Sequence, residues 1–129
     1  MKNLFILLTV LLLSQSLISQ LSLDLEKSKI KWTGKKITNA SHWGSLSFLE
    51  ADLEFDGDDL VGGKFIVDMN SMSVDDIQGR GKQRLEGHLR NEDFFDVENH
   101  KEAILLFNER VPLNNGVYEV TGTLTIKGI

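Results

Sequence analysis

Apolar and polar side chains alternate with a period of two along most of the chain, which is the pattern of half-buried β-strands. The first such segment places Ile30 and Trp32 on one face, and Gly34 allows it to bend before it continues through 35–38. Residues 39–41 have the composition of a turn. A strand followed by a turn is therefore predicted here.

The next segment, 44–56, alternates twice, and its apolar parity shifts by one residue near Leu49 and Glu50. A β-bulge produces such a shift, and barrels use bulges to turn corners. Gly57 and the two aspartates after it supply a turn. We therefore predict one long bent strand, or two shorter ones.

The strand that follows carries Phe65 and Val67 on its apolar face and is expected to end at Asp68. Small polar residues are mixed with isolated apolar ones in 69–76. This mixture predicts a connection rather than a strand.

Two further strands are predicted near the end of the chain. The segment 103–111 is almost continuously apolar, and Pro112 ends it. Asn-Asn-Gly at 114–116 indicates a hairpin turn, and 118–126 alternates cleanly, with apolar residues at even positions. Five or six antiparallel strands joined by short turns, with one helix inserted, predict an all-β protein, either a barrel or a sandwich.

One stretch departs from the period of two. Leu85 and Leu89 stand four residues apart and so share one face of a helix. Phe94 and Phe95 follow at once, among acidic residues that mark a surface turn. We predict that this helical end lies as a lid over the apolar face of the strands.

The first 19 residues have the outline of a signal peptide. A charged start precedes an apolar run from Leu4 to Leu13, which is too short to span a bilayer, and small residues follow. Cleavage is expected after Ser16 or Ser19, so the mature chain would begin near residue 17 or 20, and 20–129 is the predicted domain. We expect a periplasmic or secreted protein without stable membrane insertion, and an uncleaved membrane anchor is the alternative.

Composition and charge exclude several function classes. The chain has no cysteine, so neither a disulfide nor a thiolate metal site can form, and its net charge of −5 repels nucleic acid. His42, His88 and His100 fit no metal-ligand spacing, and no nucleophile elbow, phosphate loop or dinucleotide fingerprint is present. We expect no enzyme activity, no metal and no cofactor.

The apolar face itself remains as the candidate site. The pattern fits a packed core, but a barrel of about eight strands also encloses enough space for one small molecule. His88 could cap a ligand head group, or it could bond to a carbonyl at the helix end. The candidate ligand-binding residues, from the strands and the lid, are Ile30, Trp32, Phe48, Leu53, Phe55, Phe65, Val67, Leu89, Phe94, Phe95, Leu105, Phe107, Val120 and Leu124.

Five stretches of the sequence resemble the YceI-like family of exported, lipocalin-like domains. They are KWTGKKI (31–37), HWGSLSF (42–48), GGKFIVDMNSM (62–72), LEGHLRNEDFFDVE (85–98) and YEVTGTLTIKGI (118–129). The match covers nearly the whole mature chain, and the stretch 85–98 is its most specific part. The resemblance implies an antiparallel lipocalin-like β-barrel whose interior binds a polyisoprenoid or a similar fatty amphiphile, and it favours a cavity over a packed core.

Two features depart from the family pattern. Residues 100–103 stand where the family usually has a proline and a threonine, and the family continues through further strands after the TLTIKG motif. We therefore expect a fragment whose barrel is incomplete at the C-terminus, with an unpaired edge at 118–126 that favours aggregation or a homodimer. A secreted lipid-modifying enzyme and a protein-interaction β-domain are the alternatives to an exported lipid-binding protein.

Overall fold

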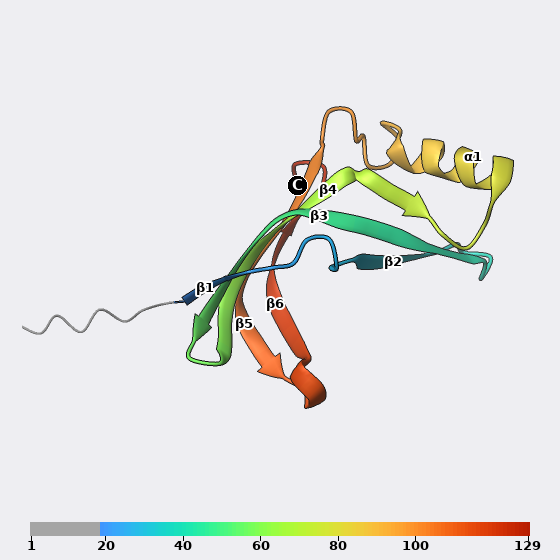
Figure 1. Cartoon of the computed structure of the whole chain (residues 1–129). Helices are drawn as coiled ribbons and strands as arrows, with labels where there is room; N and C mark the ends of the chain where they lie inside the picture. The colour runs from blue at the N-terminus through green and yellow to red at the C-terminus, as the bar shows by residue number, and fades with distance from the viewer. Residues whose placement is uncertain (1–18) are drawn as a thin grey trace, which may run out of the picture.

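An antiparallel β-sheet curled into a half-barrel, with one helix beside it, makes up the computed structural model (Figure 1), which describes residues 19–129. Residues 1–18, which make up nearly all of the predicted signal peptide, lie outside the described residues. The elements are β1 (Ser19–Ser22), β2 (Ile30–Lys35), β3 (Ser41–Asp56), β4 (Asp59–Val74), α1 (Gly79–Arg90), β5 (Glu102–Pro112), the short 3-10 turn η1 (Asn114–Gly116) and β6 (Tyr118–Thr125). The predicted class, mostly β and antiparallel with one inserted helix, is confirmed.

The two 16-residue strands β3 and β4 form the centre of the sheet. They pair with each other, and the sheet continues from β4 through β5 to β6. The other edge of β3 pairs with β2 near its start and with β1 near its end. Among the described residues, no helix has the length and apolar character needed to cross a bilayer.

The predicted irregularity in the first long strand is confirmed as a β-bulge at Leu49. Phe48 pairs with Val67, and Glu50 pairs with Ile66, so Leu49 has no partner of its own on β4. Such an extra residue bends the strand and increases its twist. The extra residue shifts the alternation by one position. The apolar residues before the bulge and those after it therefore lie on the same, concave face of β3.

The prediction that 69–76 is a connection was wrong, because β4 continues to Val74. Ser45 on β3 pairs with Ser73, whereas Ser47 pairs with Asp68, so residues 69–72 of β4 lie opposite a single residue. This long irregularity breaks the alternation that marks a strand in the sequence. Met69 and Met72 in this segment are nevertheless buried, and Val74 is fully buried.

One smaller prediction also failed, and one short strand was missed. The first strand does not continue through 35–38, because β2 ends at Lys35 and the chain turns. The Lys36 N–H donates to the Ala40 carbonyl at 2.8 Å, and Asn39 takes a φ of 66°, a left-handed conformation that asparagine tolerates. The strand β1 was not predicted at all.

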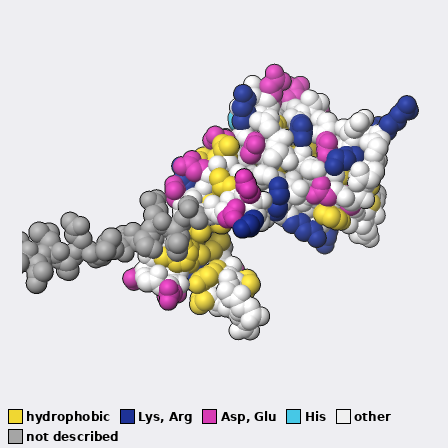
Figure 2. Space-filling view, in the orientation of Figure 1, with side chains coloured by type: hydrophobic (Ala, Val, Ile, Leu, Met, Phe, Trp, Pro, Cys, Tyr) yellow, Lys and Arg dark blue, Asp and Glu magenta, His cyan; other side chains and the backbone are white. Residues whose placement is uncertain are grey.

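The buried core is small and lies where the turn after α1 meets β4 and β5. Its main cluster consists of Val67, Met69, Met72, Val97 and Ala103. Figure 2 shows charged side chains of both signs over the upper part of the molecule and hydrophobic ones gathered toward its lower end. Because a single curled sheet covers only one side of its apolar residues, many of them remain partly exposed, and this leaves room for a ligand.

Candidate ligand cavity

The concave side of the sheet and helix α1 enclose a cavity of about 700 Å³. Ten of the fourteen predicted binding residues line it: Ile30, Trp32, Phe48, Phe65, Val67, Leu89, Phe94, Phe95, Leu105 and Leu124. These side chains come from β2, β3, β4, α1, the turn after α1, β5 and β6. The sheet register brings them together, because Phe65 pairs with Leu105, and Leu105 pairs in turn with Leu124.

The structure does not bring the other four predicted residues, Leu53, Phe55, Phe107 and Val120, to the cavity. Leu53 and Phe55 lie further along β3, toward the β3–β4 turn, and Val120 lies toward the β5–β6 turn. Phe107 is 5% exposed, and its ring stacks against Phe65 with the centroids 5.8 Å apart. Phe107 therefore packs against Phe65 outside the lining, two residues further along β5 than Leu105.

Aromatic rings supply the contact surface at two places. Phe48 and Phe65 lie on neighbouring strands with ring centroids 5.2 Å apart. In the turn after α1, the Phe94 and Phe95 centroids are 5.5 Å apart, and the His88 ring meets Phe94 edge-on at 5.7 Å. Phe94 is 48% exposed, so this second group borders the solvent.

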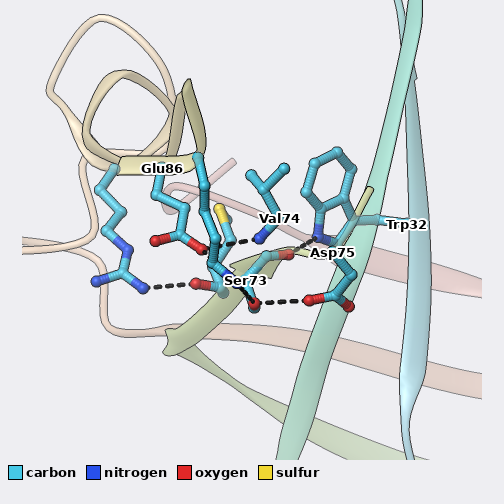
Figure 3. Close-up of polar contacts among 8 residues, drawn as sticks. Trp32, Ser73, Val74, Asp75 and Glu86 are labelled. Atoms are coloured by element: carbon cyan, nitrogen blue, oxygen red, sulfur yellow. Dashed lines mark hydrogen bonds and ion pairs between the residues drawn. The ribbon is translucent and has the colours of Figure 1, made fainter. Parts of the chain in front are cut away.

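A hydrogen bond orients Trp32 in the cavity wall (Figure 3). Its indole N–H donates to the Ser73 carbonyl at 3.2 Å, which ties β2 to the end of β4. Gly44 lies between the Trp32 ring and the Ser73 carbonyl. A Cβ at this position would be 1.8 Å from the Ser73 carbonyl oxygen and 2.7 Å from the Trp32 ring. Only glycine permits this close approach.

Helix α1 is attached to the end of β4 mainly through polar contacts, and none of its residues is buried. The Glu86 carboxylate accepts a hydrogen bond from the Val74 N–H at 2.9 Å (Figure 3), and Lys82 donates to the Ser73 hydroxyl at 3.1 Å. Arg90 donates to the Met72 carbonyl. These contacts hold the face with Leu85 and Leu89 over the cavity, where the sequence predicts a lid.

Comparison with known proteins now decides the family. The model of the YceI-like domain matches residues 21–129, which is most of the chain. The chain belongs to the YceI-like family. This family is associated with the binding of polyisoprenoid lipids, and no catalytic family is shown. A search of curated proteins found no match.

Several lining residues of this YceI-like domain were missed in the sequence. Leu46 and Ile126 share parity with predicted residues, and Leu85 shares the helix face of Leu89, so their patterns could have found them. The irregular part of β4 concealed Met69 and Met72. The remaining ones are Thr33, Gly34, Lys35, Lys36, His42 and Ala103, whereas His88, which also lines the cavity, was considered in the sequence as a cap for a head group. Most of these are polar, and an apolar pattern carries no signal for them.

The YceI-like domain also has a pair of carboxylates beside the Trp32 contact. The Ser73 hydroxyl donates to Asp75 at 2.7 Å, and this bond, followed by one from Ser45, lowers the pKa of Asp75 below its ordinary 3.8. At Asp76 burial acts to raise the pKa, but hydrogen bonds from His42, at 2.9 Å, and from the backbone outweigh it and lower the pKa. Both carboxylates are therefore ionised in the folded domain near neutral pH.

This pair predicts an acid-sensitive fold. A carboxyl whose pKa is lower in the folded state contributes stability above its unfolded pKa and loses it as pH falls through the folded pKa. The contribution of Asp75 and Asp76 should therefore be complete above their ordinary 3.8 and decline below it. The urea midpoint of an Asp75→Asn/Asp76→Asn variant, compared with the unaltered protein at about pH 6 and about pH 3, measures this. The difference should be largest at the higher pH, and a difference that grew on acidification would contradict it.

Proposed function

We propose that this YceI-like domain binds a polyisoprenoid or a similar single-chain fatty amphiphile in its cavity and carries or sequesters it in the periplasm or outside the cell. One observation carries the proposal: residues predicted from the sequence as one apolar face line a common cavity of about 700 Å³. That volume falls in the range of about 300–1,000 Å³ typical of small-molecule sites. The pattern of residues 1–19 supports export.

The expected source of affinity is burial of the lipid tail. Transfer of a methylene group out of water contributes about 0.8 kcal/mol, so a long chain binds firmly with few polar contacts. Phe48, Phe65 and Leu105 offer an extended apolar surface without a hydrogen-bonding pattern that would select one tail. We therefore expect selection by length and apolar character, with loose specificity.

Mass spectrometry of an organic extract from the purified exported protein tests this proposal. We expect an apolar lipid in nearly equal molar amount to the protein, and its mass spectrum identifies the chain. The extract from an identically purified variant with a charge in the cavity, Leu105→Glu, serves as the control and should lack it. Protein that yields no lipid, and that also fails to bind added farnesol, would refute the proposed function.

A further inference from the structure

The ionisable side chains that line the cavity are all nitrogen bases. They are Lys35, Lys36, His42 and His88, and no aspartate or glutamate is among the described residues of the lining. The whole chain has 19 acidic and 14 basic residues and a net charge of −5. A cavity lining with basic and no acidic side chains therefore differs from the acidic protein as a whole. It favours the binding of an anion over that of a cation.

The two lysines lie where the cavity meets the solvent. Lys35 is the last residue of β2, and Lys36 is in the turn to β3, at the same end of the sheet as α1 (Figure 1). Both residues are exposed, whereas the neighbouring lining residues Ile30 and Trp32 are partly buried. The cavity therefore runs from an apolar interior to a basic end, the arrangement that suits a molecule with an apolar tail and a charged head.

These lysines are also free to bind a ligand. Within residues 19–129, neither Lys35 nor Lys36 has an ion pair or side-chain hydrogen bond, whereas other lysines do. Lys31 instead makes a cation–π contact, with its Nζ 4.7 Å from the centroid of the Trp43 ring. The acid Asp76 lies near this end, but it is already bonded to His42 at 2.9 Å.

We propose that Lys35 and Lys36 bind the anionic head group, phosphate or carboxylate, of an amphiphile whose tail occupies the cavity. This inference rests on the proposed function and adds the charge of the ligand to it. The head group keeps part of its hydration at the exposed end of β2, so it avoids the cost of an unpaired buried charge. Trp32, Phe48 and Phe65 contact the tail, and a cationic amphiphile is disfavoured by repulsion from the lysines.

Binding of matched lipid pairs tests the head-group site. Farnesyl phosphate is compared with farnesol, and palmitate with hexadecanol, by titration calorimetry below the concentrations at which they aggregate. We expect the anionic member to bind about five- to tenfold more tightly, the size expected for two partly exposed ion pairs. The preference should shrink between about 20 mM and about 300 mM salt, because salt screens exposed charges. A preference confined to one pair supports the site and identifies its head group.

Two double variants locate the site. Lys35→Gln/Lys36→Gln should lose the preference for the anion and retain its affinity for farnesol. The control Lys29→Gln/Lys31→Gln removes the same charge from residues that do not line the cavity, and it should retain the preference.

Other results would overturn the head-group proposal in different ways. Equal binding of farnesyl phosphate and farnesol would refute the head-group site and leave the proposed lipid function intact. A preference for the anionic lipid that survives in the Lys35→Gln/Lys36→Gln variant would also refute the head-group site. So would a preference that is lost equally in this variant and in the Lys29→Gln/Lys31→Gln control. Failure of all four lipids to bind would instead refute the proposed function.

Discussion

Leu105→Glu is expected to abolish lipid binding while the half-barrel stays folded, and Leu106→Glu is expected to leave both unchanged. The two leucines are neighbours on β5 and face opposite sides of the sheet. Leu105 lines the cavity, between Phe65 and Leu124 on the adjacent strands. Leu106 is 51% exposed and pairs with Lys64. The same substitution therefore places a carboxylate among apolar side chains in one variant and beside a lysine in the other.

The expected size of the effect follows from the cost of an unpaired charge. A carboxylate among apolar groups costs several kcal/mol unless it protonates or reaches water. An empty cavity admits water, so much of that cost falls on ligand binding, and about 3 kcal/mol corresponds to a roughly hundredfold weaker Kd. In the Leu106→Glu variant the new carboxylate instead lies across from Lys64, and a cross-strand pair of opposite charges is mildly favourable.

Circular dichroism and the amount of co-purifying lipid check this prediction. If Leu105→Glu unfolds, Leu105→Ala provides a milder test, and it should fold and bind lipid more weakly than Leu106→Ala. Folded Leu105 variants that retain the full amount of lipid would show that the lipid does not occupy the cavity.

Gly44→Ala is expected to destabilise the sheet strongly, although it adds only one methyl group. The new Cβ would lie 1.8 Å from the Ser73 carbonyl oxygen and 2.7 Å from the Trp32 ring. Gly44 is held between two strands, because it pairs with Trp32 on β2 and with Val74 on β4. Relief of the clash therefore requires the strands to separate and the Trp32 hydrogen bond to break.

We expect the free energy of unfolding to fall by about 3 kcal/mol or more, at the upper end of the cost of overpacking. For a domain of this size the melting temperature would then fall by roughly 10–20 °C. Gly34→Ala is the matched control, because its Cβ would meet the Trp32 ring at an ordinary 3.7 Å, and it should change the stability by less than about 1 kcal/mol. Equal melting temperatures for the two variants would mean that β2 and β4 are not held together at Gly44.

The local geometry of the strands could be predicted from the sequence. In a strand, successive side chains point to opposite faces, so Ile30 with Trp32, and Phe65 with Val67, could be assigned to one face without knowledge of the fold. The bulge at Leu49 was readable for the same reason, since one extra residue shifts the parity of all that follow. The family could be named because its sequence blocks extend over nearly the whole chain.

The failure to predict the second half of β4 has one local and one long-range cause. The stretch 69–72 of β4 lies opposite a single residue of β3, and this removes the alternation by which a strand is recognised. Its two methionines are nevertheless buried, because the turn after α1 brings Val97 against them. That contact joins residues about 25 positions apart in the sequence, and a periodic pattern contains no information about such a contact.

The sequence by itself determined which residues of the regular strands share an apolar face, and the tertiary structure alone decided which of them share a cavity. Leu105 and Phe107 have the same parity, yet Leu105 lines the cavity and Phe107 packs against Phe65 outside it. The difference arises from the curl of the sheet and the position of α1, which enclose one part of the concave face. Lys35 and Lys36 join the lining because the turn after β2 lies at the end of the sheet beside α1. Parity is a property of neighbouring residues, whereas a cavity depends on how distant strands and the helix are placed together.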